Sequence, residues 1–208
     1  MDFKNKQEEF WTGAFGNQYI ERNDSQGLLA SNIMLFSKII SRTRDIKSVI
    51  EFGANIGLNL LSIKALIPNV ELSGVEINDN AVKELREAVG TGKVYHDSIF
   101  NFRTDYKRDF VLSKTFLIHI QPDLLNTVYD LLYETSNKYI CIAEYYNPTP
   151  VEVTYRGHEG VLFKRNFAGD LLDRFKDLSL IEYGFAYRRD NYYSAFYDDI
   201  NWFLLEKC

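Results

Sequence analysis

The sequence has little that would indicate a secreted, membrane or nucleic-acid-binding protein. It contains only two cysteines, Cys141 and Cys208, in 208 residues, which is too few for a disulfide framework and favours a reduced, cytoplasmic protein. No apolar run approaches the roughly 20 residues of a membrane span, and the stretch from Met1 to Glu9 lacks the apolar core of a signal peptide. With a net charge of −5, the chain also lacks the basic excess that nonspecific nucleic-acid binding needs.

Repeats, low-complexity tracts and linkers are also missing, and there are only four prolines. Because 208 residues suffice for one sizeable α/β domain, we expect a single domain over residues 1–208, with a polar, aromatic-rich lead over 1–30. The three histidines are scattered, and no cluster has metal-ligand spacing, so we expect no metal site.

What the chain does contain is a regular alternation of strand and helix patterns. This alternation predicts a doubly wound, mostly parallel α/β sheet of seven strands with helices on both faces. The last two strands form a predicted C-terminal antiparallel hairpin, and the crossing from 97 to 109 is expected to be irregular. The predicted strands are 48–52, 70–76, 93–97, 109–113, 138–145, 178–187 and 201–206, and the predicted helices are 28–40, 57–67, 79–89, 122–136 and 167–175.

The most specific feature is the segment that joins the first strand to the next helix. Gly53 and Gly57 allow a tight turn in which no Cβ blocks a ligand. The helix behind them presents free N–H groups and a positive dipole end. Glu76 ends the next strand, nineteen residues after Gly57, where a carboxylate can accept hydrogen bonds from a ribose diol. The spacing therefore predicts a site for a ribose-containing ligand.

Asn55 bears on which ribose ligand binds. A dinucleotide-binding loop has three glycines, because the middle one lets the backbone approach a pyrophosphate, and this chain has Asn55 in that region. The E-x-G-x-x-x-G pattern from Glu51 to Gly57 instead resembles motif I of the class I S-adenosylmethionine-dependent methyltransferases. Asp97-Ser98 and the segment 113–120 resemble later motifs of that family in the same order. The resemblance implies S-adenosyl-L-methionine as the cofactor, with Asp97 accepting from the adenine amino group and the cofactor held by Glu51, Gly53, Asn55, Gly57, Glu76, Asp97 and Ser98.

Segments along most of the chain resemble a narrower group, the methyltransferases associated with pseudaminic acid biosynthesis. They include Phe15 to Asn23, Ile142 to Pro148, Tyr155 to His158, Phe163 to Phe167, and Asp198 to Leu204. The resemblance implies a small-molecule acceptor, a sugar or nucleotide-sugar in surface or flagellar glycan biosynthesis. Asn166 stands where we expect an acidic residue in this group, so no charged role is assigned to it.

The acceptor side is predicted from aromatic and basic residues that cluster in an insertion, residues 145–165, which is expected to lie outside regular structure. Aromatic rings stack on a sugar or a sulfonium, and arginine binds carboxylate or phosphate through two hydrogen bonds. Tyr19 and Arg22 are expected to close over the cofactor as a lid or a carboxylate clamp. The predicted acceptor-binding residues are Lys114, Tyr145, Tyr155, Arg156, Lys164 and Arg165.

A general base is needed only where the nucleophile is a hydroxyl or an ammonium group. His119 and His158 are the candidates, although the apolar surroundings of His119 suit a core role equally well. Three other functions remain open: a protein methyltransferase, a non-catalytic cofactor-binding scaffold, and an NAD-dependent sugar-nucleotide oxidoreductase. The last predicts a third loop glycine and a Tyr-x-x-x-Lys relay, and the chain has neither. The sequence leaves open the acceptor, O- or N-methylation, and the oligomeric state.

Overall fold

The computed structural model describes residues 5–23, 26–90, 92–190 and 199–208, and for residues 21–23 it describes the backbone alone. The chain divides into two compact units, residues 1–103 and 104–208. None of the helices in the described part of the chain has the length and apolar character that crossing a membrane requires.

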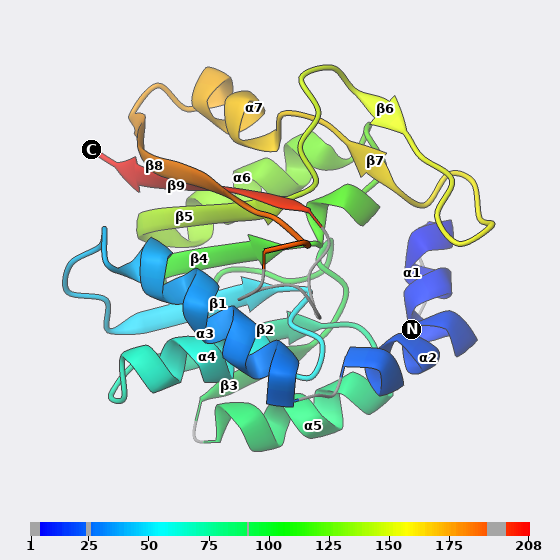
Figure 1. Cartoon of the computed structure of the whole chain (residues 1–208), viewed down its shortest axis with the longest axis horizontal. Helices are drawn as coiled ribbons and strands as arrows, with labels where there is room; N and C mark the ends of the chain where they lie inside the picture. Colours follow the sequence, from blue (N-terminus) through cyan, green and yellow to red (C-terminus); the bar gives the residue numbers. More distant parts are fainter. Residues whose placement is uncertain (1–4, 24–25, 91, 191–198) are drawn as a thin grey trace. The chain divides into compact units, whose positions relative to one another are not determined.

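The first unit is built on parallel strands with helices between them (Figure 1). β2 pairs in parallel with β1, with Ile50 opposite Ser73, and with β3, with Val75 opposite Tyr95. β1 and β2 are buried over most of their length, as expected for parallel strands covered on both faces. The elements are α1 (Lys6–Thr12), α2 (Ala14–Asn23), α3 (Gln26–Ile40), β1 (Ser48–Phe52), α4 (Leu58–Leu66), β2 (Glu71–Glu76), α5 (Asp79–Val89) and β3 (Lys93–His96).

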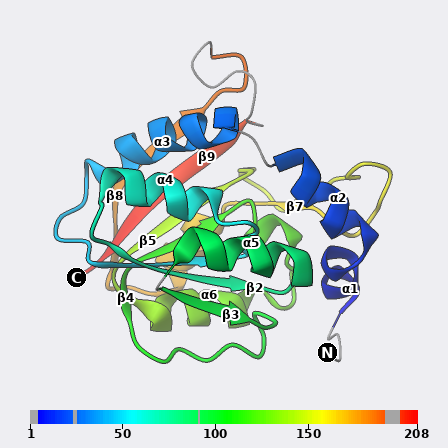
Figure 2. The same cartoon turned by 90° about the horizontal axis from the view of Figure 1, so that it is seen from below.

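α4 and α5 pack on the strands of this unit and bury apolar side chains there. α3 and α4 lie side by side (Figure 2). α5 buries Ala81, Val82, Leu85 and Val89, which recur at the spacing of one helix face. The same spacing predicts this helix from the sequence.

The second unit continues the pattern and ends with antiparallel strands. β4 and β5 are parallel, with Leu112 opposite Cys141. β5 and β9 are antiparallel, as are β9 and β8. The elements are β4 (Arg108–Lys114), a 3₁₀ turn η1 (Leu117–His119), α6 (Leu125–Thr135), β5 (Ser136–Glu144), β6 (Val151–Glu152), β7 (Phe163–Lys164), α7 (Phe167–Arg174), β8 (Leu178–Ala186) and β9 (Ile200–Lys207).

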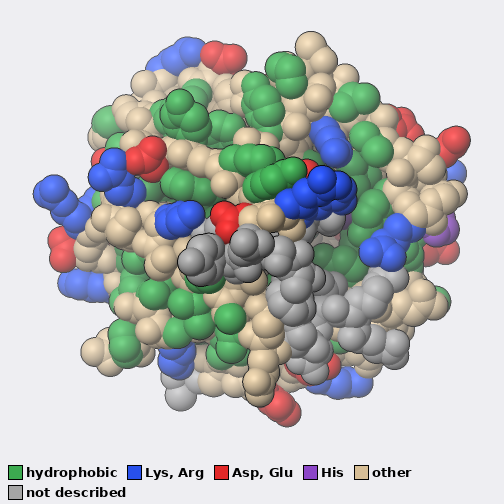
Figure 3. Space-filling view, in the orientation of Figure 1, with side chains coloured by type: hydrophobic (Ala, Val, Ile, Leu, Met, Phe, Trp, Pro, Cys, Tyr) green, Lys and Arg blue, Asp and Glu red, His purple; other side chains and the backbone are tan. Residues whose placement is uncertain are grey.

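The main sheet has the strand order β3-β2-β1-β4-β5-β9-β8. It is a seven-stranded, mostly parallel sheet with a C-terminal antiparallel pair, so the predicted fold class is confirmed. The last strand in this order, β8, exposes hydrophobic side chains that include Tyr183 and Phe185. Hydrophobic side chains gather over this strand in the space-filling view (Figure 3).

Two local predictions were wrong, and two helices lie where none was predicted. These helices are α1 and α2, in the lead over 1–30. The helix expected to begin at Pro122 begins at Leu125, because the preceding residues form a turn in which the Leu124 N–H donates to the Gln121 carbonyl at 2.9 Å. The insertion 145–165 is not wholly irregular, since β6 and β7 pair within it. The crossing from 97 to 109, all of it described, has no helix, as predicted. The connection between the two predicted strands of the C-terminal hairpin lies largely outside the described residues.

Candidate functional site

The turn between β1 and α4, residues 53–57, has the tight geometry that its glycines predict. Gly53, Asn55 and Gly57 have φ values of 71°, 47° and 84°, a region that glycine adopts freely and asparagine tolerates. The Gly57 N–H donates to the Ala54 carbonyl at 2.9 Å, and the Gly53 N–H donates to the Val75 carbonyl at 2.9 Å. These bonds close the turn and fasten it to the end of β2.

Gly57 is also required by the packing of α5. A Cβ at this position would lie 2.9 Å from the Ala88 Cβ and 2.9 Å from the Leu85 Cδ1. A side chain at position 57 would therefore push α5 away from the turn. The absence of a Cβ on Gly57 lets the turn and α5 pack closely.

Glu76, at the end of β2, is bonded to the turn through its side chain. Its Oε2 accepts from the Asn55 N–H at 2.8 Å, and its Oε1 accepts from the N–H groups of Ile77 and Asn78 at 2.9 and 2.8 Å. Burial raises the pKa of Glu76, and these N–H groups partly offset the rise. A carboxylate has about four acceptor positions, so about one remains for a ligand hydroxyl.

Asp97 and Ser98 follow β3 and lie beside the end of β2, since the Asp97 N–H donates to the Glu76 carbonyl at 3.2 Å. Asp97 Oδ1 accepts from the Ser98 N–H at 2.8 Å and from Asn101 Nδ2 at 3.2 Å. The buried Ser98 hydroxyl is bonded to the carboxylate of Glu8 on α1. Asp97 therefore lies close to Glu76 along the strand ends, while the Ser98 side chain is occupied in holding α1.

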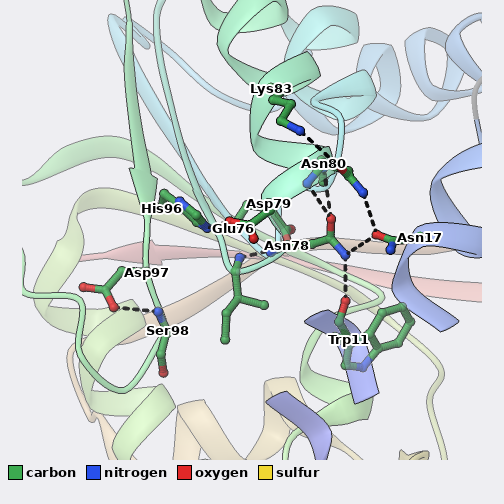
Figure 4. Close-up of polar contacts among 12 residues, drawn as sticks. Trp11, Asn17, Glu76, Asn78, Asp79, Asn80, Lys83, His96, Asp97 and Ser98 are labelled. Atoms are coloured by element: carbon green, nitrogen blue, oxygen red, sulfur yellow. Dashed lines mark hydrogen bonds and ion pairs between the residues drawn. The ribbon is translucent and has the colours of Figure 1, made fainter. Parts of the chain in front are cut away.

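Asn78 is a residue of this site that sequence reasoning missed (Figure 4). Its Oδ1 caps α5 by accepting from the N–H groups of Asn80 and Ala81 at 2.9 and 3.1 Å. Its Nδ2 donates to the Trp11 carbonyl at 2.9 Å and to Asn17 Oδ1 at 3.1 Å. One buried amide thus joins α1 and α2 to the end of β2. The available signal was an asparagine just before a helical pattern, a common N-cap.

The predicted lid residue Tyr19 lies on α2. Its ring packs edge-to-face on Trp11, with 5.2 Å between ring centroids. The neighbouring Ile20 is buried against Ile56 of the turn, in a cluster with Ala81 and Leu58. α2 therefore lies against the turn that the glycines form. The side chain of Arg22, the other predicted lid residue, lies outside the described part of the chain.

Glu51, the first residue of the E-x-G-x-x-x-G pattern, is fully buried in β1. Its Oε1 accepts from Asn59 Nδ2 on α4 at 2.6 Å. The structure thus brings the predicted cofactor residues Glu51, Gly53, Asn55, Gly57, Glu76, Asp97 and Ser98 together at the carboxyl ends of β1, β2 and β3, where open α/β sheets bind their ligands.

In the second unit, Glu144 at the end of β5 is the centre of a hydrogen-bonded group that sequence reasoning did not single out. Its Oε1 accepts from the Ser113 hydroxyl at 2.7 Å and from the N–H groups of Phe116 and Leu117, both at 3.0 Å. Burial raises the pKa of Glu144 to about 7. The only signal in the sequence was a carboxylate at the end of a strongly apolar strand.

His119, a predicted base, ends η1 and is buried. Its Nδ1 lies 2.7 Å from the Val161 carbonyl oxygen. Because a carbonyl only accepts, Nδ1 carries the proton and Nε2 is the acceptor in the neutral ring. Burial lowers the pKa of His119 to about 4, so the ring is neutral at pH 7. A neutral ring can accept a hydrogen bond, but burial opposes the imidazolium that a general base becomes.

His158 and Arg156 lie on a two-residue hairpin. Tyr155 and His158 exchange backbone hydrogen bonds of 2.9 Å, and Arg156 and Gly157 between them both have positive φ, 51° and 85°, as in a type I′ turn. The side chains of Arg156 and His158 are exposed. Tyr155 instead lies near His119, with 5.7 Å between the ring centroids. The structure therefore brings Tyr155 and His119 together and leaves the other two on the hairpin tip.

The remaining predicted acceptor residues are dispersed. Lys164 Nζ lies 5.1 Å from the centre of the Tyr145 ring, and Lys114 is half-buried at the end of β4. Arg165 Nε forms an ion pair with Asp170 Oδ2 of α7 at 2.7 Å. Asn166, where an acidic residue was expected, caps α7 by accepting from the Gly169 N–H at 2.9 Å.

No group of three or more His, Cys, Asp or Glu side chains within residues 5–23, 26–90, 92–190 and 199–208 could hold a metal ion. No protein-family model matches the sequence. No curated protein matches it either.

The fold is that of the class I S-adenosylmethionine-dependent methyltransferases. A magnesium protoporphyrin IX methyltransferase from Synechocystis PCC 6803 with bound S-adenosylmethionine is similar over 100% of both chains, with a TM-score of 0.70 and 11% identity. An S-adenosylmethionine-dependent methyltransferase from Leishmania major is similar over 96% of this chain and 81% of its own (TM-score 0.72, 13% identity). The Burkholderia thailandensis 1,6-didemethyltoxoflavin-N1-methyltransferase, with 1,6-didemethyltoxoflavin and S-adenosylhomocysteine bound, is similar over 96% of this chain and 86% of its own. The TM-score is 0.71 and the sequence identity is 11%. At sequence identities this low, the structural similarity shows that the folds are alike and shows nothing about the substrate.

Proposed function

We propose that this chain is an S-adenosyl-L-methionine-dependent methyltransferase that acts on a small molecule. The observation that carries the proposal is the 2.8 Å hydrogen bond from the Asn55 N–H to Glu76 Oε2, which joins the glycine turn to the carboxylate expected to bind a ribose. The fold supports it, since structural neighbours of this fold are methyltransferases crystallised with S-adenosylmethionine or S-adenosylhomocysteine.

The residues of the turn fit this cofactor better than a dinucleotide. Asn55 has a side chain in the region where a dinucleotide-binding loop has its middle glycine, and that glycine allows the approach of a pyrophosphate. S-adenosylmethionine has no pyrophosphate. Glu76, with about one acceptor position left, would accept a hydrogen bond from a ribose hydroxyl, and Asp97 would accept from the adenine amino group. Glu51 would lie near the methionine part.

Catalysis by these residues consists mainly of alignment. The cofactor supplies a methyl group on a sulfonium, whose thioether is a good leaving group. Holding the nucleophile in line with that group can contribute an effective molarity of about 10⁵ M or more. The neutral His119, with its Nδ1 proton directed at Val161, would accept a hydrogen bond from the nucleophile through Nε2 and orient it. When the nucleophile is a hydroxyl, its proton would pass to water as the bond to the methyl carbon forms and the C–S bond breaks.

For the acceptor we propose a sugar or nucleotide-sugar of the pseudaminic acid type. Two pairs in the insertion support an anionic, ring-containing molecule: Lys164 with Tyr145, and Arg156 with Tyr155, whose cations lie 5.1 and 5.7 Å from the ring centres. Cations bind phosphate or carboxylate, while aromatic rings stack on sugars. The pairs provide both kinds of contact.

Calorimetric titration with S-adenosylmethionine, S-adenosylhomocysteine and NADH tests the proposed cofactor. We expect micromolar binding of the first two to the wild type, at least tenfold weaker binding to Glu76→Ala, and unchanged binding to Glu84→Ala, a control on the exposed face of α5. Circular dichroism establishes that the variants are folded. Binding of NADH alone, or of none of the three, would contradict the proposal.

The acceptor is tested separately, by formation of S-adenosylhomocysteine with a panel of nucleotide-sugars and with flagellin. Turnover with a nucleotide-sugar that falls in Lys164→Ala and Arg156→Ala supports the sugar proposal. Turnover with flagellin alone would make the chain a protein methyltransferase.

A further inference from the structure

Glu144 is a buried carboxyl group for which the proposed chemistry gives no direct use. It is 2% exposed. Its Oε1 accepts three hydrogen bonds, from Ser113, Phe116 and Leu117. Its Oε2 is buried and has no hydrogen-bond partner among the described residues. Burying a carboxyl group with one oxygen unpaired is unfavourable. Glu144 must therefore contribute something at the end of β5 that offsets this cost.

The three donors to Glu144 all come from residues 113–117, which run from the end of β4 into the start of η1. This segment includes Thr115, a β-branched residue with a φ of 51°, a conformation that persists only when its surroundings impose it. The Thr115 N–H donates to the Ala143 carbonyl at 3.0 Å. Residues 143 and 144 at the end of β5 therefore hold the segment 113–117 on both sides of the strained residue.

The same segment leads directly into His119. The His119 N–H donates to the Phe116 carbonyl at 2.9 Å, which closes η1, and the ring is bonded through Nδ1 to Val161 in the insertion. The position of the ring thus depends on two attachments, the backbone held by Glu144 and the side-chain bond to Val161.

We propose that Glu144 is a positioning residue of the acceptor site, which fixes the segment 113–117 through Oε1 and thereby sets the place and the tautomer of the His119 ring. Only the assignment of His119 to the acceptor side rests on the proposed function. Glutamine keeps a side-chain oxygen that can accept from the three donors, so Glu144→Gln should hold the segment 113–117 as the wild type does. Alanine leaves the Phe116 and Leu117 N–H groups without this acceptor.

The test is nuclear magnetic resonance of wild type, Glu144→Ala and Glu144→Gln. In Glu144→Ala we expect hydrogen exchange at the Phe116 and Leu117 amides to rise at least tenfold. The ¹⁵N spectrum of His119 should change from one Nδ1–H tautomer to a mixture. Glu144→Gln should restore both signals, which a merely bulky or stabilising side chain would not do. Tyr133→Phe is the control, because it removes a hydrogen bond to Asp177 in the same unit and none of the three donors to Glu144.

Wild-type exchange and an unchanged His119 spectrum in folded Glu144→Ala would overturn the proposal, as would failure of Glu144→Gln to restore them. If Glu144→Ala does not fold, Ser113→Ala decides, since it removes one donor to Oε1 and should raise exchange at the same two amides by a smaller factor; unchanged exchange there would also overturn the proposal. Titration of each protein with S-adenosylhomocysteine keeps the two proposals separate. If the wild type does not bind S-adenosylhomocysteine, the proposed function is wrong. The amide exchange and the His119 ¹⁵N spectrum still decide the role of Glu144.

Discussion

The backbone N–H of Asn55 lies 2.8 Å from Oε2 of Glu76, although 21 residues separate them in the chain. The bond connects the two parts of the motif on which the ligand prediction depends, the glycine turn and the acid at the end of β2. It also means that Glu76 has a structural role before any ligand binds.

Replacing Glu76 by glutamine should therefore weaken the fold as well as ligand binding. Glutamine has one oxygen, so its NH₂ group must face either the Asn55 N–H or the N–H groups of Ile77 and Asn78. Leaving a buried donor without an acceptor costs about 1–3 kcal/mol. We expect urea unfolding to show a loss of that order. Glu84→Gln on the exposed face of α5 is the control, and equal stability of the two variants would contradict the assigned bonds.

Gly57 and Gly157 form a matched pair for a second prediction. Their φ values are 84° and 85°, but a Cβ on Gly57 would meet Ala88 and Leu85 at 2.9 Å, whereas one on Gly157 would have nothing within 4 Å. Gly157→Ala should cost only the left-handed backbone strain, about 1–2 kcal/mol. Gly57→Ala should cost about 1–3 kcal/mol more for overpacking.

Urea unfolding of both alanine variants measures the difference. Equal losses of stability would mean that α5 yields to the added methyl group, and that backbone strain alone requires the glycine.

Most of the fold could be predicted from the sequence because its signals are local. The first strand was predicted over 48–52 and is β1 (Ser48–Phe52), and the helix predicted over 79–89 is α5 (Asp79–Val89). In each case a short apolar run or a helical period fixes the element. α1 was missed because it buries polar residues, Gln7 and Glu8, so its buried face has no apolar period.

The candidate site could be predicted only where the residue type and its position allow few alternative roles. Glycine turns and a strand-end acid have few alternatives, which is why Gly53, Gly57 and Glu76 could be placed together. Asn78 and Glu144 act through bonds to residues far away in sequence, such as Trp11 and Ser113. No spacing rule reports contacts of that kind. Basic residues have many uses, and Arg165, predicted to bind the acceptor, pairs with Asp170.

Gly16 provides a third prediction, on the docking of α1 and α2. A Cβ there would lie 1.8 Å from the Trp11 carbonyl oxygen and 2.9 Å from Asn78 Nδ2. Gly16→Ala must therefore move α2 or break the bond from Asn78 to Trp11. We expect the Trp11 environment to change in near-ultraviolet circular dichroism and S-adenosylhomocysteine to bind about tenfold more weakly, about 1.4 kcal/mol. Gln18→Ala, on the exposed side of α2, should change neither, and a wild-type spectrum for Gly16→Ala would contradict the packing.

Glu144 and His119 should affect stability with opposite dependence on pH. Burial raises the pKa of Glu144 from 4.5 to about 7, so the folded state binds a proton that the unfolded state releases, and stability falls as pH rises from 4.5 to 7. Burial lowers the pKa of His119 from 6.5 to about 4, so stability falls as pH drops from 6.5 to 4. Over its full pH interval, each pKa shift changes the free energy of unfolding by about 3 kcal/mol. Between pH 4.5 and 6.5 the two slopes oppose each other and should nearly cancel.

Single variants should reveal each slope. The free energy of unfolding of Glu144→Gln minus that of the wild type should increase by about 3 kcal/mol as pH rises from 4.5 to 7, because glutamine has no proton to lose. The same difference for His119→Gln should increase by a similar amount as pH falls from 6.5 to 4. Urea unfolding across this range measures both, and each subtraction removes the contribution of every other titrating group. Differences that do not vary with pH would mean that neither group is held in its neutral form by burial, and that the His119 ring is available to act as a base.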